Sequence, residues 1–292
     1  MFVRAVELAA NFTWPVVIST RRQSGAVDTA IGTIVVVNSD GWFVTAAHLL
    51  DISKAADADA PKVVAYQNAL GAVEATAGLT PKQRRQRTAR IKQDPQWITN
   101  ISHWWGRDGI GVPGLLEVDA LADLDVGKLE PFDPSWVPVY PRFKAGAGEL
   151  PSGASLCRLG FPFHEVKSTF DQTTGSFTLA PEAVPLPRFP NEGILTRIVM
   201  LKDPASGRTV RFLETSSPGL RGQSGGPIFD VEGAIWGIQS RTVNFPLGFS
   251  PEVSLPGGRT VTEHQFMNVG WGAHVNEVAR VLTKVGVSPS LA

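Results

Sequence analysis

The feature that most constrains this chain is a succession of short β-branched runs separated by glycine and proline. Residues 16–20 and 31–37 are such runs, and the pattern returns after Leu115. The 292 residues include 29 glycines and 22 prolines, a content that suits a fold with many turns. Many short strands joined by turns are typical of all-β barrels and sandwiches. The sequence therefore predicts an all-β fold class.

One predicted hairpin leads to a histidine. Asp40-Gly41 follows the run at 31–37 and supplies the positive φ of a tight turn. Residues 42–46 are then expected to return as a strand that delivers His48 at its end. Further strands are predicted at residues 126–129, 155–160, 176–179, 194–201, 209–214, 227–229 and 234–240.

Two segments have helical rather than β periodicity. Residues from about 51 to 105 are rich in Ala, Lys, Arg and Gln, and helices are expected over about 61–76 and 81–92. We interpret this block as a helical insertion in the β fold. The valine stripe of residues 275–286 predicts one amphipathic C-terminal helix. The second helix of the insertion contains six basic residues, namely Lys82, Arg84, Arg85, Arg87, Arg90 and Lys92.

The charge balance and the cysteine count exclude several classes of protein. The 27 basic and 27 acidic residues cancel, which argues against a nucleic-acid partner or an anionic membrane. A single cysteine, Cys157, rules out a disulfide framework and a zinc site built from cysteines. No metal or organic cofactor is expected. Because no apolar run could span a membrane and the first residues lack a signal-peptide pattern, a cytoplasmic location is expected.

Two short segments carry the chemistry that the sequence predicts. One is Thr-Ala-Ala-His at residues 45–48, and the other is Gly-Gln-Ser-Gly-Gly-Pro at residues 222–227. Glycines around a serine allow a sharp turn and the close approach of a substrate carbonyl. They also let the amides of Gly222 and Ser224 point at one spot, as in a backbone oxyanion hole. A serine hydroxyl needs a base within hydrogen-bond reach to act as a nucleophile, and histidine is the usual base.

These segments resemble the trypsin/chymotrypsin-like serine peptidases, which carry Thr-Ala-Ala-His and Gly-x-Ser-Gly-Gly-Pro. The acid of that family lies in a β-like stretch that begins with Asp, and Asp125 with the four residues after it matches this stretch. The order His48, Asp125, Ser224 is the chymotrypsin-type order. The resemblance implies a serine endopeptidase in which His48 is the general base, Asp125 orients it and Ser224 is the nucleophile. Gly222 and Ser224 would form the oxyanion hole.

The same resemblance implies the fold and its organisation. Two six-stranded antiparallel β-barrels of chymotrypsin type would pack face to face around the site. The first, residues 1–140, would hold the histidine, the aspartate and the helical insertion. The second, residues 141–292, would hold the serine and the C-terminal helix. Gln223 stands where zymogen-derived members have an aspartate, so the chain resembles HtrA-like and other bacterial trypsin-like branches, without a PDZ domain.

The resemblance also implies where a protein or peptide substrate would bind. The base of the first specificity pocket would come from Pro218, Gly219 and Leu220, none of which is acidic. A Lys or Arg side chain is therefore not expected there, and a small or apolar one is. The strand expected to pair with the substrate backbone contains Ser240, Arg241 and Thr242.

Some alternatives stay open at this point. Asp123 is a rival to Asp125, because the two would share one face of a strand. A trypsin-type fold can lose activity and serve as a binding or regulatory module, with the insertion at 51–105 recruiting a protein partner. An α/β-hydrolase esterase also carries Gly-x-Ser-x-Gly, but it needs a helix directly after the serine, and Gly225-Gly226-Pro227 disfavours one.

Overall fold

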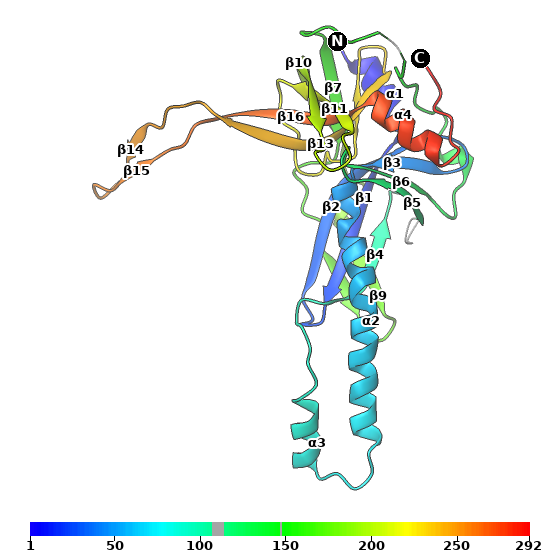
Figure 1. The fold of residues 1–292 in the computed structure, drawn as a ribbon, viewed down its shortest axis with the longest axis vertical. Helices are drawn as coiled ribbons and strands as arrows, with labels where there is room; N and C mark the ends of the chain where they lie inside the picture. The colour runs from blue at the N-terminus through cyan, green and yellow to red at the C-terminus, as the bar shows by residue number, and fades with distance from the viewer. Residues whose placement is uncertain (107–113, 147) are drawn as a thin grey trace.

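Two antiparallel β units form the body of the protein in the computed structural model, which describes residues 1–106, 114–146 and 148–292 (Figure 1). The first unit is a six-stranded sheet in the order β4-β1-β2-β3-β6-β5. Gly41, at φ +81°, makes the predicted tight turn between β2 and β3. The strands of this sheet are β1 (Thr13–Arg22), β2 (Val27–Val36), β3 (Trp42–Thr45), β4 (Ile98–Trp104), β5 (Gly114–Asp119) and β6 (Leu124–Lys128).

The second unit closes on itself as a barrel. Its six strands are hydrogen-bonded in the order β10-β11-β16-β13-β12-β7. Together the two units confirm the predicted all-β fold class. The strands of the barrel are β7 (Ser155–Gly160), β10 (Phe189–Lys202), β11 (Thr209–Thr215), β12 (Pro227–Phe229), β13 (Ile235–Pro246) and β16 (Phe266–His274).

A long two-stranded ribbon leaves the barrel. It is the continuation of β13 and β16, which pair as far as Pro246 and Phe266 and extend away from the body (Figure 1). The sequence pattern predicts neither the ribbon nor β16. The remaining short elements are the paired strands β8 (Ser168–Asp171) and β9 (Ser176–Leu179), the paired strands β14 (Glu252–Ser254) and β15 (Thr260–Thr262), and the 3-10 turns η1 (Pro134–Trp136) and η2 (Pro181–Ala183).

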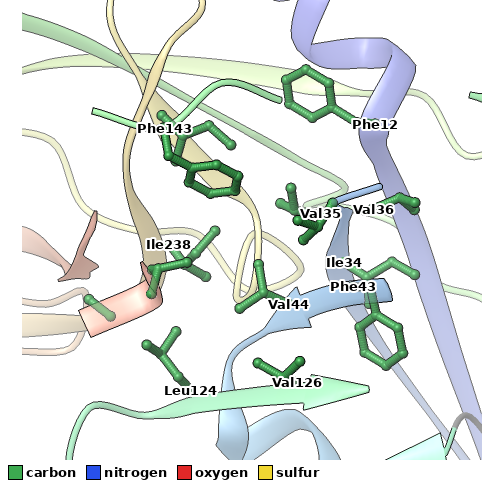
Figure 2. Packing of buried hydrophobic residues seen from close by; sticks show 14 of the residues in the cluster. Phe12, Ile34, Val35, Val36, Phe43, Val44, Leu124, Val126, Phe143 and Ile238 are labelled. Atoms are coloured by element: carbon green, nitrogen blue, oxygen red, sulfur yellow. The ribbon is translucent and has the colours of Figure 1, made fainter. Parts of the chain in front are cut away.

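One continuous apolar core joins the two units. Figure 2 shows Val44 and Val126 of the first sheet near Ile238 of the barrel, with Phe12 in the same cluster. All four side chains are at most 1% exposed. Full burial of such a side chain contributes about 1.5–3 kcal/mol. The units are therefore packed on each other, and side chains at their junction are held in fixed positions.

Helix α2 (Ala47–Ala75) is longer than the sequence predicts. It begins directly after β3 and runs for 29 residues. Pro61, where the sequence predicts the helix to begin, lies inside it. Proline cannot donate to the carbonyl of Asp57, but Asp57 is exposed, so water can satisfy that oxygen. The first part of α2 packs on the body through residues such as Leu50. Beyond Val63 no residue of α2 is buried, and the helix projects from the body (Figure 1).

Helix α3 (Pro81–Thr88) lies beside the outer part of α2 (Figure 1). Its start is the predicted one, because Thr80 and Gln83 form a reciprocal cap. Its end comes before Lys92, and β4 then pairs with β1. The helical insertion therefore ends before β4 rather than near residue 105, since that stretch supplies an edge strand of the first sheet.

Helices near both ends of the chain pack on the body. Helix α4 (Val275–Lys284) matches the predicted C-terminal helix and buries its valine stripe. Helix α1 (Val3–Phe12) is an addition to the predicted elements, and its buried residues Ala5, Ala9 and Phe12 follow helical spacing. Within the described part of the chain, no helix is both long and apolar enough to cross a membrane.

Candidate active site

His48 lies in the first turn of α2, where Asp123 holds it from a neighbouring turn. The Nδ1 atom of His48 is 2.9 Å from Asp123 Oδ2 and 3.1 Å from Oδ1. The backbone N–H of His48 donates to Asp123 Oδ1 at 3.0 Å, and that of Ala47 donates to the Asp123 carbonyl at 3.1 Å. The Ser240 hydroxyl also donates to Asp123 Oδ2. Asp123 thus caps the helix and orients the imidazole at the same time.

Asp125, the residue predicted to orient His48, makes no hydrogen bond to it. Asp125 lies in β6 opposite Thr45, and its buried carboxylate is 3.5 Å from Lys54 Nζ. Asp123 precedes β6 in a left-handed conformation with φ +55°, so the alternation of a strand does not apply to it. The sequence predicted that Asp123 and Asp125 share one face of a strand. This prediction is wrong, because Asp123 lies outside β6. Asp123, not Asp125, is the carboxylate that contacts His48.

The contact with Asp123 sets the ionisation of both groups. The hydrogen bond to Asp123 raises the pKa of His48 above its ordinary value of 6.5, although burial opposes the rise. Burial acts to raise the pKa of Asp123, but the hydrogen bonds from His48 and Ser240 outweigh it and lower that pKa. Asp123 is therefore ionised at neutral pH and stabilises the cationic form of His48.

We expect acylation of Ser224 to follow the raised pKa of His48. Only the neutral imidazole is a base, so the rate should rise with pH and level off above that pKa. Asp123→Asn removes the stabilising charge and should move the midpoint to lower pH. The rate of fluorophosphonate labelling, measured from acidic to mildly alkaline pH, checks both statements. A wild-type midpoint below the ordinary value of 6.5 would contradict the first.

The buried carboxylate of Asp125 should lower stability at neutral pH. Burial raises the pKa of Asp125 to about 6, although Lys54 opposes the rise, and no described residue donates a hydrogen bond to it. Because the folded pKa exceeds the unfolded value of 3.8, the stabilisation is complete below that value and is lost as pH rises through about 6.

Asp125→Asn cannot ionise, so it should raise the free energy of unfolding at neutral pH by roughly 2–3 kcal/mol. Denaturant unfolding of the variant and the wild type measures the difference. The gain should vanish in acid, at about pH 3, which lies below both the folded and the unfolded pKa, so that Asp125 is protonated in both states. Equal stabilities at neutral pH would refute the expectation.

Ser224 follows a turn that orients two backbone amides. The Gln223 N–H donates to the Leu220 carbonyl at 2.8 Å, and Gly222 between them has φ +97°. In this four-residue turn only the third residue, Gly222, has positive φ, which defines a type II turn. In a type I turn the peptide group between the second and third residues would point the opposite way. Within the described residues, no backbone hydrogen bond uses the N–H of Gly222 or Ser224. Both amides can therefore serve an external acceptor, as an oxyanion hole requires.

The loop that carries Ser224 is tied to the first sheet through Thr33 of β2. The Thr33 N–H donates to the Ser224 carbonyl at 2.8 Å, and its hydroxyl donates to the Gly222 carbonyl at 2.8 Å. Gly225 has φ +83°, and a Cβ there would lie 2.0 Å from the Thr33 carbonyl oxygen. Only glycine fits this close approach. Thr33 carries no motif signal, so sequence reasoning missed it.

Gln223 holds the same turn from inside the protein. Its side chain is fully buried, its Oε1 accepts from the Leu220 N–H at 3.1 Å, and its Nε2 donates to the Phe189 carbonyl at 3.2 Å. A neutral amide therefore braces the turn with two hydrogen bonds. No charged partner is needed at this position, which agrees with the missing aspartate noted in the sequence.

His48, Asp123 and Ser224 line one cleft of about 630 Å³. Ser224 is half-buried, and its hydroxyl donates to the Ser240 carbonyl at 3.3 Å. No hydrogen bond joins Ser224 to His48 among the described residues; such contacts are often long before substrate binds. The predicted substrate-binding residues that also line this cleft are Gly219, Leu220, Ser240, Arg241 and Thr242.

Pro218, the remaining residue predicted to contact substrate, is not part of the cleft lining. Its carbonyl accepts hydrogen bonds from Arg158 at 3.2 Å and from Asn191 at 2.9 Å. These donors approach from strands β7 and β10, so Pro218 belongs to the support of the pocket wall rather than to its surface.

The cleft offers a hydroxyl, an imidazole–carboxylate pair and two amides. In the described ranges, no group of three or more His, Cys, Asp or Glu side chains is placed to hold a metal ion. The chemistry that this set supports is activation of a serine hydroxyl with stabilisation of an oxyanion.

Comparison with known proteins gives a family match and similar folds. The family model described as "Trypsin-like peptidase domain" matches residues 32–238. The active form of the Rv3671c protease from M. tuberculosis has a TM-score of 0.50 at 15% identity, covering 99% of this chain and 86% of that one. A serine-to-alanine variant of the HtrA-type protease AlgW, with a tripeptide, gives 0.50 at 15%, covering 98% and 63%. These two likenesses concern the fold alone. No curated protein matches the chain.

Proposed function

The chain belongs to the trypsin-like peptidase domain family, and from this premise we propose that it is a serine endopeptidase with Ser224, His48 and Asp123 as its triad. The observation that carries the proposal is the single cleft in which Asp123 binds His48 and Ser224 follows a turn with two available amides. Asp123 takes the place that the sequence assigned to Asp125. Protein or peptide substrates follow from the family.

The proposed reaction proceeds through an acyl-enzyme. His48 takes the proton of the Ser224 hydroxyl as Oγ attacks the carbonyl carbon of the scissile peptide bond. The amides of Gly222 and Ser224 bind the oxyanion, and Asp123 stabilises the imidazolium. His48 then protonates the leaving amine as the C–N bond breaks. Water, deprotonated by His48, hydrolyses the ester and restores the hydroxyl.

Covalent labelling of Ser224 tests the proposal. A fluorophosphonate forms a stable adduct only with an activated serine, so intact mass should show one adduct on the wild type. Ser224→Ala should show none. Ser250→Ala is the matched control, because Ser250 is an exposed serine that also contacts a histidine, His264, at 3.1 Å. Absence of an adduct on the folded wild type would reject an active resting site.

A second candidate, a partner-controlled or binding role, is favoured by the helical arm, which we define as residues 64–97. No residue of the arm is buried, although it contains the outer part of α2, residues 64–75, and all of α3 (Figure 1). A helical segment that buries no face in its own chain leaves its surface accessible to another molecule. We propose that a regulatory protein partner binds here.

Replacing residues 68–94 with a Gly-Ser linker tests the arm. The change keeps Tyr66 and Trp97, whose rings contact each other at the base of the arm. The full-length Ser224→Ala protein should retain a partner that the shortened protein loses. Adding that partner should change the labelling rate of the full-length enzyme and leave the shortened enzyme unchanged. An equal response of the two enzymes would exclude the arm as the binding site.

The cysteine chemistry supports a proposed cytoplasmic location. Cys157 is buried and unpaired, so the chain contains no disulfide. Chains without disulfides are typical of reducing compartments. Selective recovery of the protein from an extracellular or periplasmic fraction would contradict this location.

A further inference from the structure

The charges that line the cleft do not cancel. The charged residues of its lining, besides His48, are Asp123, Arg221 and Arg241. Asp123 is engaged by His48 and by the Ser240 hydroxyl. No carboxylate of the described residues forms an ion pair with Arg221 or Arg241. The charge that the cleft presents to a ligand is therefore positive.

The two arginines reach the cleft from different segments beside Ser224. Arg221 is the second residue of the type II turn that precedes the serine. Arg241 belongs to β13, where its Nε donates to Ser240 Oγ at 3.3 Å and its guanidinium carbon lies 5.4 Å from the Phe212 ring centroid. It is also near enough to His48 to oppose the rise of the histidine pKa. Both arginines line the same cleft as Ser224, so a peptide bond placed at Ser224 lies in a cleft to which each segment contributes one cation.

Two close contacts narrow the pocket beside these arginines. Thr242 Oγ1 donates to the Gly219 carbonyl and so connects the strand to the loop across the pocket. A Cβ at Gly219 would lie 2.1 Å from Gln239 Nε2, which shows how closely the Gln239 side chain fills the space behind the loop. These contacts reduce the space for a side chain between the loop and the strand and favour a short side chain, whose end lies beside the two arginines.

A third cation lies behind the pocket wall. Arg158 is 2% exposed and donates to Ser217 Oγ, to the Ser217 carbonyl and to the Pro218 carbonyl. Its Nε has no partner, and it forms no ion pair among the described residues. Burial lowers the pKa of Arg158 to about 10, so it stays charged at neutral pH. A buried charge is weakly screened, and it disfavours a cationic side chain in the pocket.

We propose that the cleft selects peptides with a short acidic side chain beside the scissile bond, and that Arg221 and Arg241 are the residues that determine this specificity. The inference rests on the proposed function for the placement of the scissile bond at Ser224. It sharpens the expectation of a small or apolar side chain, because the pocket limits length while its rim attracts a carboxylate. Two nearby carboxylates do not cancel the attraction, since Asp123 is bound to His48 and Asp51 is paired with Lys54 at 3.1 Å.

Peptide binding to the Ser224→Ala protein tests the proposal without requiring catalysis. The probes are fluorescein-labelled peptides of one sequence whose two central residues are Asp, Asn or Lys, and the readout is fluorescence anisotropy. The Asp peptide should bind roughly tenfold more tightly than the Asn peptide, as two partly exposed ion pairs allow. The Lys peptide should bind most weakly. High salt should reduce the preference for Asp, because exposed charges are screened.

Charge-reversal variants test whether Arg221 and Arg241 cause the preference for the Asp peptide. Arg221→Glu with Arg241→Glu should abolish or invert the order of Asp and Lys peptides. Arg259→Glu, an equal charge change on the exposed turn between β14 and β15, should leave the order unchanged. Equal binding of the Asp and Asn peptides to the Ser224→Ala protein, or no binding of any probe, overturns the inference. This result does not depend on the folding of the charge-reversal variants. Fluorophosphonate labelling of the wild type, run in parallel, decides separately whether the proposed function holds.

Discussion

Ser224→Ala and His48→Ala should each lower kcat/KM for a peptide substrate by about 10⁶-fold, and the double variant should be no slower than either. The nucleophile and its base act as one unit, so removing either leaves the other without a function. Residual hydrolysis should remain above the uncatalysed rate, because the amides of Gly222 and Ser224 still bind the oxyanion. Single-turnover hydrolysis of one fluorogenic peptide by all four proteins measures these effects.

The chain contains its own control for this experiment. Ser250 Oγ lies 3.1 Å from His264 Nδ1, so a second Ser–His contact exists outside the cleft. Ser250→Ala and His264→Ala should leave kcat/KM unchanged. A large loss in these variants, or additive losses in the Ser224 and His48 variants, would mean that the cleft is not the centre of the reaction.

Asp123→Asn should lower kcat/KM by about 10⁴-fold without unfolding the protein. The amide keeps the size of the carboxylate, but it cannot stabilise the imidazolium that forms when His48 takes the proton of Ser224. It also presents an N–H group toward Nδ1, which favours the wrong tautomer of the base. The loss should appear in kcat, since Asp123 acts on His48 rather than on the bound peptide.

Asp125→Asn is the matched control, because the two aspartates are two positions apart and both are buried. The substitution should leave kcat/KM unchanged while it raises stability at neutral pH. The reverse outcome, a large loss from Asp125→Asn and little from Asp123→Asn, would restore Asp125 as the acid. Circular dichroism of both variants shows that activity is compared between folded proteins.

The local motifs predict the positions of the serine and the histidine because they describe backbone geometry as well as chemistry. Gly222 and Gly225 adopt positive φ on either side of Ser224, and the Gly225 position leaves no room for a Cβ. The aspartate that contacts His48 could not be chosen from such a motif. The choice between Asp123 and Asp125 depends on the φ of Asp123, which is positive. The neighbouring residues contain no sequence signal for a left-handed conformation at this position.

Other residues of the site are absent from every local pattern. Thr33 is distant in sequence from Ser224, yet its two hydrogen bonds tie the serine loop to the first sheet. Gln223 is visible in the motif, but its contact with the Phe189 carbonyl depends on the closure of the barrel. In the sequence Arg158 is only one residue of a predicted strand. Its hydrogen bond to Ser217 Oγ, which supports the pocket wall, is visible only in the structure.

The all-β class, the amphipathic C-terminal helix and the two motifs that contain His48 and Ser224 can be found in the sequence alone, because they depend on periodicity and on residues adjacent in the chain. Three features are visible only in the folded chain: α2 continues through Pro61, residues 98–104 pair with the first sheet, and Asp123 contacts His48. Each of these depends on long-range contacts or on solvent access to one carbonyl. A local pattern contains neither, because both arise only when segments far apart in the chain take their places in the first unit.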